Sequence, residues 1–140
     1  MWKIVESFDL PNKLKTFFQE TGLNIAIQAE ACGPKLNGNR LGLNKPTLFV
    51  FNVKNLLTGE WFGLQQITNI CQKLNLPMVT VLQTFVFNES IDWLQEIANS
   101  VKYSNGSLGE GIVIRPVTPV YSSILGKYLS VKILNQNYKD

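Results

Sequence analysis

The 140-residue sequence contains no histidine, only two cysteines and no apolar run long enough to cross a membrane. Without histidine, His-ligated metal sites, Ser-His or Cys-His nucleophiles and histidine general bases are all excluded. Cys32 and Cys71 do not match the spacing of a zinc site. They are as consistent with small core residues as with partners in a disulfide. The N-terminus lacks the basic start and apolar stretch of a signal peptide, so we expect a soluble, cytoplasmic protein.

Charged residues are few, and their signs nearly balance. The sequence has 13 Lys and Arg against 10 Asp and Glu, a formal net charge of +3. This mildly favours an anionic partner but lacks the basic stripe of a strong nucleic-acid binder. An apolar fraction of 45% over this length is enough for one globular core. We therefore expect a single domain spanning residues 1–140.

Hydrophobic periodicity divides the chain into helices and strands, with no internal repeat or linker. Apolar positions at helical spacing predict three helices, over residues 10–21, 63–74 and 91–101. Alternating or continuous apolar runs predict five strands, over residues 24–31, 47–53, 78–82, 110–116 and 128–134. This order predicts an α+β fold with a largely antiparallel sheet flanked by helices.

Alternation along the predicted strands assigns side chains to faces. In residues 24–31, the apolar Ile25 and Ile27 face one way and Glu30 the other. Residues 47–53 are apolar enough to be buried on both sides, with Asn52 on the same face as Val50. In residues 128–134, Lys132 shares one face with Tyr128 and Ser130.

Four residues on four of these strands together suit a nucleotide. Burying Glu110 unpaired would cost about 2–7 kcal/mol, so this carboxylate must meet a cation or lie in an open cleft. A carboxylate such as Glu30 or Glu110 can hold a ribose hydroxyl or Mg²⁺. The ring of Phe51 can stack on a base, and Lys132 can meet a phosphate. The alternative is that the four are unrelated surface or core residues.

The order of several motifs resembles a known superfamily. Residues 110–115, Glu-Gly-Ile-Val-Ile-Arg, resemble motif IV of the covalent nucleotidyltransferases, which include ATP-dependent DNA ligases, RNA ligases and mRNA capping enzymes. Residues 28–34 followed by Asn39 are similar to motif III in its RNA-ligase form, residues 49–53 to motif IIIa, and residues 129–133 to motif V. The resemblance covers nearly the whole chain, and the loop after motif III favours the RNA ligases.

The resemblance implies an adenylate pocket that uses ATP and Mg²⁺. By this resemblance, Glu30 would contact the ribose and Phe51 would stack on adenine. Glu110 would serve the phosphate and metal step, and Lys132 would contact the transferred phosphate. Three further nucleotide-binding candidates follow from the same resemblance: Asn39, Arg40 and Arg115.

The sequence also departs from the family pattern. The nucleophile of the family is a lysine followed one residue later by Asp-Gly, and no Lys-x-Asp-Gly occurs in these 140 residues. We therefore expect a chain that begins after this motif, as a truncated, split or excised form that cannot adenylylate itself. The missing segment would come from another chain, and exposed sheet edges would invite self-association. Ser130 replaces a frequent second lysine of motif V, and Ala29 replaces a usual glycine.

Three functional hypotheses follow. The first is an RNA-ligase-like nucleotidyltransferase, which would join RNA ends through a lysyl-AMP intermediate but here lacks the nucleophilic lysine. The second is a non-catalytic module that binds a nucleotide or RNA. The third is a globular domain whose motif matches are coincidental.

Overall fold

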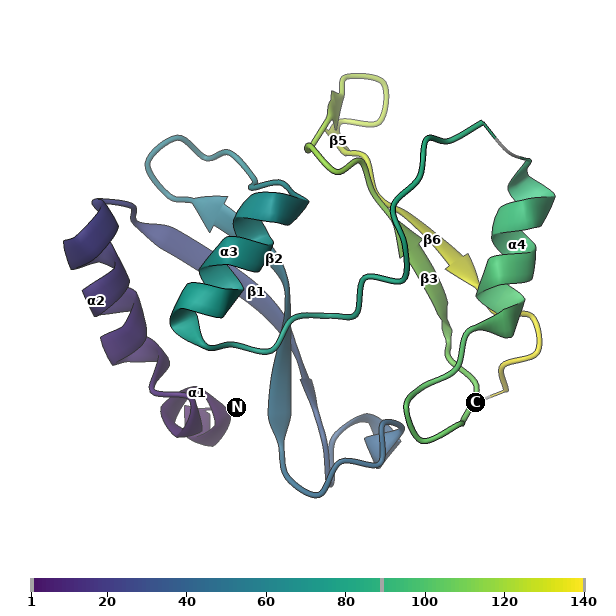
Figure 1. Cartoon of the computed structure of the whole chain (residues 1–140), viewed down its shortest axis with the longest axis horizontal. Coiled ribbons are helices and arrows are strands. Elements are labelled where there is room, and N and C mark those ends of the chain that lie inside the picture. The colour runs from purple at the N-terminus through teal and green to yellow at the C-terminus, as the bar shows by residue number, and fades with distance from the viewer. Residues whose placement is uncertain (1, 89, 140) are drawn as a thin grey trace. The chain divides into compact units, whose positions relative to one another are not determined.

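The chain folds into two compact units, each containing helices and antiparallel strands (Figure 1). The computed structural model describes residues 2–88 and 90–139. The N-terminal unit comprises the described residues of 1–39 and 43–80, and the C-terminal unit those of 40–42 and 81–140. The strands pair in three two-stranded antiparallel sheets, which confirms the predicted α+β class. Among the described helices, none is long and apolar enough to span a membrane.

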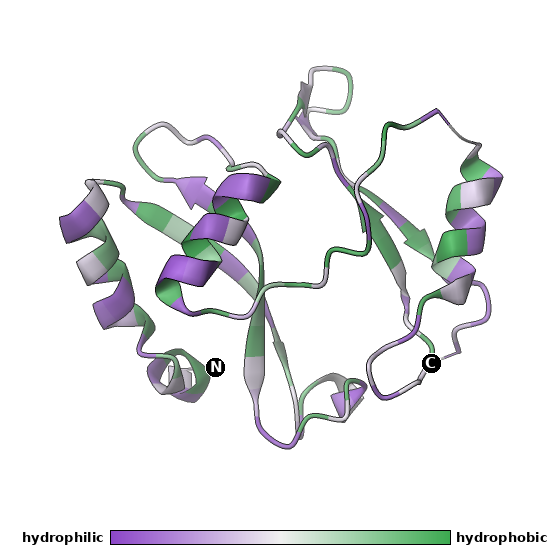
Figure 2. Cartoon of the chain, in the orientation of Figure 1, coloured by the Kyte–Doolittle hydropathy of each residue, from purple (hydrophilic) through white to green (hydrophobic). Residues whose placement is uncertain are grey.

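The N-terminal unit contains two predicted helices and two predicted strands, with an additional first helix. Its elements in order are α1 (Trp2–Ser7), α2 (Leu10–Thr21), β1 (Ile25–Cys32), the short 3-10 helix η1 (Asn37–Asn39), β2 (Thr47–Asn55) and α3 (Leu64–Leu74). Helix α2 ends at Thr21 and is capped by Gly22, which has a left-handed φ of 70° and whose N–H donates to the carbonyl of Phe18. Around the helices, hydrophilic and hydrophobic residues alternate, as expected for helices with one buried face (Figure 2).

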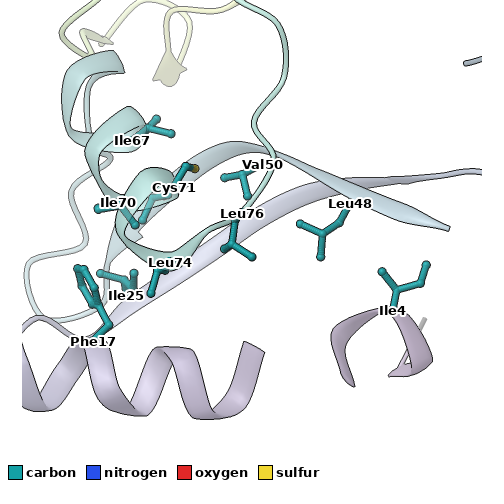
Figure 3. Close-up of a cluster of buried hydrophobic side chains, with 11 residues drawn as sticks. Ile4, Phe17, Ile25, Leu48, Val50, Ile67, Ile70, Cys71, Leu74 and Leu76 are labelled. Carbon is teal, nitrogen blue, oxygen red and sulfur yellow. The ribbon is translucent and has the colours of Figure 1, made fainter. Parts of the chain in front are cut away.

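The core of this unit lies on one face of the β1–β2 pair. Val50 and Val53 of β2 are completely buried, and α3 presents apolar side chains at helical spacing against them. Figure 3 shows most of this cluster, which consists of Ile4, Phe17, Ile25, Leu48, Val50, Val53, Ile67, Ile70, Cys71, Leu74 and Leu76. Each fully buried Val or Leu side chain stabilises the folded state by about 1.5–3 kcal/mol relative to an exposed one. The opposite face of β1–β2 is not part of this core.

A β-bulge in β2 changes the predicted assignment of faces. The register pairs Gln28 with Asn52 but Ala29 with Val50, so Phe51 is an extra residue on β2. The bulge brings both Val50 and Val53 to the core and turns Asn52 to the other face, where its Nδ2 donates to Gln28 Oε1 at 2.9 Å. The prediction that Asn52 shares a face with Val50 is therefore wrong. The prediction that this strand is buried on both faces is also wrong, because Phe51 and Asn52 are only half-buried.

Residues 78–82 do not form the predicted strand. Met78 makes a single parallel bridge to Val50, formed by bonds from Val50 N–H to the Pro77 carbonyl and from Val79 N–H to the Val50 carbonyl. The bulge at Phe51 follows immediately and bends β2. Beyond this bridge, residues 79–82 have no regular secondary structure.

The C-terminal unit places one helix against a two-stranded sheet. Its elements are α4 (Ile91–Ser100), β3 (Gly111–Ile114), β4 (Tyr121–Ser122), β5 (Lys127–Tyr128) and β6 (Val131–Leu134). Helix α4 begins as predicted, with Ser90 Oγ accepting the N–H of Trp93 at 3.2 Å. Leu94 and Ala98 of α4 are buried, and the helix contacts both β3 and β6.

The predicted strand over residues 128–134 is divided in two. Tyr128 belongs to the β4–β5 hairpin, where the centre of its ring lies 5.4 Å from the centre of the Tyr121 ring. Of the predicted strand, only β6 pairs with β3. Tyr128 and Lys132 therefore do not share one strand face. In the β3–β6 pair, the buried Ile112 lies opposite Ile133. Val113 and Lys132 form the next pair and are exposed.

Candidate functional site

Glu110 lies between two cations in the C-terminal unit. Lys132 Nζ is 3.0 Å from Glu110 Oε2, and Arg40 Nη1 is 3.6 Å from Oε1. All three side chains are partly exposed: 47% for Glu110, 53% for Lys132 and 39% for Arg40. Glu110 thus meets cations at an open surface. We call these three residues the Glu110 cluster.

The Glu110 cluster is better suited to binding than to stabilising the fold. An exposed ion pair contributes only about 0.2–1 kcal/mol to stability, because water and salt screen it. One carboxylate and two cations leave the cluster with an excess of one positive charge. Such an arrangement attracts an anion, and both cations can donate charge-assisted hydrogen bonds to phosphate oxygens.

Gly111 explains how Glu110 reaches Lys132. Regular alternation would put Glu110 on the same face as the buried Ile112, whereas Lys132 is paired with Val113 on the exposed face. Gly111 has a φ of 148°, and a Cβ at this position would collide with the carbonyl oxygen of Ile133. Only glycine fits this conformation and close approach. The Glu-Gly sequence is therefore what breaks the alternation and turns the carboxylate outward.

Arg40 is held from two sides within the same unit. Its carbonyl oxygen accepts hydrogen bonds from Asn105 Nδ2 at 3.0 Å and from Ser107 Oγ at 3.3 Å. Its guanidinium carbon lies 4.9 Å from the centre of the Tyr138 ring, a cation–π contact. Sequence reasoning did not identify Tyr138, Asn105 or Ser107, since only their contacts with Arg40, distant in sequence, reveal their roles.

Arg115 follows β3 and contacts the residue that replaces a lysine in the motif V pattern. Its Nε donates to Ser130 Oγ at 3.3 Å. Burial lowers the pKa of the Arg115 guanidinium below its ordinary value, and arginine stays charged in proteins nonetheless. Arg115 therefore adds another cation to the unit that carries the Glu110 cluster.

In the N-terminal unit, Glu30 and Phe51 lie on the face of β1–β2 opposite the core. Glu30 pairs with Phe49 and is exposed. Phe51 occupies the bulge between Val50 and Val53, both of which reach the core, so its half-buried ring lies on the other side. The two predicted residues share this face. Bulges often redirect a side chain next to a functional site.

The charge of Glu30 is felt by a neighbouring thiol. The pKa of Cys32 is raised, first by burial and then by the negative charge of Glu30. Neither cysteine of the described structure is in a disulfide. Cys32 is therefore a local reporter of the Glu30 carboxylate.

Asn39 has a structural role in the loop after β1. Its Nδ2 donates to the Leu43 carbonyl and its Oδ1 accepts the Leu43 N–H, both at 3.0 Å. This reciprocal pair closes the loop that contains Arg40. A direct contact of Asn39 with a nucleotide stays a prediction.

The Glu110 cluster fits a phosphate together with a metal better than a metal alone. Among the described residues, no three His, Cys, Asp or Glu side chains gather as a metal site would require. Glu110 offers one carboxylate, already facing two cations. Mg²⁺ commonly takes only one or two protein carboxylates and completes its shell with phosphate oxygens and water. The residues present therefore fit a metal that arrives with a nucleotide.

A family model described as RNA ligase matches residues 1–132 of the chain. The chain belongs to the RNA ligase family. Sequence comparison finds no matching curated relative. Motif order in the sequence predicted this family, and the match confirms it.

Solved structures similar to this RNA ligase family chain include RNA ligase from Naegleria gruberi. The form with PPi has a TM-score of 0.79 at 17% identity, over 96% of this chain and 38% of that one. A lysine-to-alanine variant with ATP and Mn has a TM-score of 0.80 at 17% identity, over the same shares. A lysine-to-methionine variant with AMP and Mn has a TM-score of 0.78 at 17% identity, again over 96% and 38%. The likeness confirms the predicted fold, which is that of part of this ligase, and the chain spans about 38% of the ligase's length.

Proposed function

We propose that this chain binds ATP or AMP with a divalent cation and supplies the adenylate-binding part of a site that joins RNA ends. The observation that carries the proposal is the Glu110 cluster, which holds a carboxylate between Lys132 and Arg40 at an open strand face. By the resemblance seen in the sequence, its glutamate and lysine would stand at the motif IV and motif V positions, and the chain belongs to the RNA ligase family. The N. gruberi relative, solved with ATP or AMP and Mn, supports the ligand class.

The C-terminal unit would bind the phosphates. Lys132 and Arg40 would donate hydrogen bonds to phosphate oxygens, and Arg115 would add positive charge. Glu110 would orient Lys132 and offer one oxygen to Mg²⁺ when the nucleotide brings the ion. Bound Mg²⁺ would neutralise charge on the phosphates.

The N-terminal unit would bind the nucleoside. Phe51 would stack on adenine, a contact worth about 1–3 kcal/mol per base. Glu30 would accept a hydrogen bond from a ribose hydroxyl, and Asn39 would keep the following loop closed. These roles rest on the motif positions and on the open face that Glu30 and Phe51 share.

The nucleophile would come from outside these 140 residues. Adenylyl transfer needs a lysine Nζ that attacks the α-phosphorus of ATP while pyrophosphate leaves. No Lys-x-Asp-Gly is present, so we infer a truncated or split form that does not adenylylate itself. A chain carrying that lysine and an RNA substrate would be its partners, with self-association as an alternative. The expected cytoplasmic location stays a prediction.

A calorimetric titration of the protein with ATP and MgCl₂, repeated with MnCl₂, tests nucleotide binding. We expect Lys132→Met to weaken ATP binding at least about tenfold, because hydrogen bonds to charged groups contribute about 1.5–3 kcal/mol. The control is Lys127→Met, which removes an exposed lysine of β5 in the same unit. Equal affinity in both variants, or no ATP binding by the unaltered chain, would overturn the proposal.

The alternative is a non-catalytic module that binds a nucleotide or RNA, and the absence of Lys-x-Asp-Gly favours it. Glu110→Ala separates the two when a segment carrying the missing lysine is added. A metal-assisted site should lose ligation far more than ATP affinity. A binding module would show no ligation before or after the substitution.

A further inference from the structure

We propose that Asn135 is a positioning residue that holds Glu110 and Arg40 in place, an inference that rests on the proposed function of the Glu110 cluster. Asn135 directly follows β6 and is 4% exposed. Among the described residues, it is the one buried polar side chain. A buried amide is retained where its hydrogen bonds are satisfied and specify geometry. Its bonds lead directly to the cluster.

Asn135 fixes the backbone on both sides of the Glu110 Cα. Its N–H donates to the Glu110 carbonyl at 2.8 Å, and its Nδ2 donates to the Gly109 carbonyl at 2.9 Å. The backbone is also crowded here, because a Cβ on Gly109 would lie 2.8 Å from Val101 Cγ1. The position of the Glu110 Cα is therefore fixed by the backbone, independently of the ion pair with Lys132.

Asn135 also organises the turn that supports Arg40. Its Oδ1 accepts the N–H of Asn137 at 2.9 Å, and its carbonyl accepts the N–H of Tyr138 at 3.1 Å. This turn presents the Tyr138 ring to the Arg40 guanidinium, which in turn reaches Glu110 Oε1. One buried residue thus links the carboxylate and one of its cations. The other cation, Lys132, lies on the strand that leads into the turn.

The test uses Asn135→Asp, which keeps the shape and the Oδ1 acceptor but turns a donor to the Gly109 carbonyl into an acceptor. The control is Asn99→Asp. Asn99 Oδ1 accepts the N–H of Gln136 at 2.8 Å, so the control adds the same charge beside the same turn without an Asn99 bond to Gly109 or Glu110.

The first readout needs no ligand. In NMR spectra, Glu110→Gln should move the Lys132 side-chain signals of the unaltered chain and of Asn99→Asp. In Asn135→Asp, this movement should fall to less than half. An undiminished movement would overturn the positioning role, whatever the protein binds.

The second readout is the ATP affinity, measured as a double-mutant cycle. Asn135→Asp should weaken ATP binding about tenfold beyond Asn99→Asp, and should weaken it by a smaller factor when Glu110→Gln is already present, because only the support of Arg40 is then left to lose. Equal losses in both backgrounds would mean that Asn135 acts on the fold and not through Glu110. If the unaltered chain binds no ATP, the proposed function fails while the NMR readout still decides the role of Asn135.

Tyr138 provides a second variant if Asn135→Asp does not fold. Tyr138 is only half-buried, so its substitution should leave the unit folded. Tyr138→Leu removes the ring next to Arg40 and should weaken ATP binding about threefold, whereas Tyr138→Phe keeps the ring and should bind as the unaltered chain does. Equal affinity of the two variants would overturn the support of Arg40 by this turn.

Discussion

The two units of the chain are stabilised in different ways. Among its described residues, the N-terminal unit has a cluster of eleven buried apolar residues, contributed by α1, α2, α3, one face of β1–β2 and Leu76. In the described C-terminal unit, the buried apolar residues are Leu94, Ala98 and Ile112. There, the geometry around Glu110 depends on glycine conformation and on hydrogen bonds from loops and turns. The difference teaches that the unit with the smaller core carries the charged cluster, and that polar contacts set the geometry of that cluster.

The largest expected effect comes from opening a cavity in the N-terminal core. Phe17 is 3% exposed, and Phe17→Ala should destabilise the N-terminal unit by about 3–5 kcal/mol. Its neighbour Phe18 is 50% exposed, so Phe18→Ala should change stability by less than about 0.5 kcal/mol. Urea unfolding with amide exchange measures both. Equal changes in stability for Phe17→Ala and Phe18→Ala would show that α2 does not bury the face that carries Phe17.

A smaller loss is expected from a single methyl group in the C-terminal unit. Gly111→Ala should destabilise β3–β6 by about 1–3 kcal/mol or more, because its Cβ has no room and its φ is 148°. Gly126→Ala is the control, since Gly126 also has a positive φ, 63°, but nothing lies within 4 Å of the added Cβ. Gly111→Ala should also reduce ATP affinity, and Gly126→Ala should not. Thermal unfolding and ATP titration of both variants provide the comparison.

The ion pair of the Glu110 cluster should contribute little to the fold. In a double-mutant cycle of urea unfolding with Glu110→Gln and Lys132→Met, we expect a coupling of about 0.2–1 kcal/mol, as for exposed pairs. The coupling should shrink further in high salt. A coupling of several kcal/mol would mean that the pair stabilises the unit and would weaken the case for a binding role.

The smallest expected effect is chemical. Because the charge of Glu30 contributes to the raised pKa of Cys32, Glu30→Gln should lower that pKa and increase the thiolate fraction at pH 8. Alkylation of Cys32 should then be about two- to threefold faster. Cys71 is the internal control, since burial alone raises its pKa. Unchanged alkylation of Cys32 in this variant would place the Glu30 carboxylate too far away to matter.

Sequence reasoning predicted the elements whose signals are local. Helix α3 follows from its apolar spacing, α2 from Pro11 and Gly22, and α4 from the Ser90 cap. For Glu110 the sequence predicted either a cation partner or an open cleft, and in the structure two cations meet this carboxylate at an exposed surface. Family membership followed from the order of four motifs, each weak alone.

Features that depend on pairing between distant segments were not predictable. The bulge at Phe51 arises from the register with β1, and the sequence of residues 47–53 contains no local signal that predicts it. The predicted strand over 78–82 is apolar but finds a partner only at Val50. Tyr138 and Asn135 gain their roles from Arg40 and from residues 109–110, which are remote in sequence. Periodicity within one segment carries no information about such contacts.

The most direct test of the central claim is the intact mass of the purified chain after incubation with ATP and MgCl₂, under conditions where calorimetry shows ATP to be bound. The account predicts an unchanged mass, because in the proposed function the chain would supply the adenylate pocket and another chain would supply the attacking lysine. An acid-stable AMP adduct on a lysine of this chain would contradict it and would identify a complete nucleophile within these 140 residues.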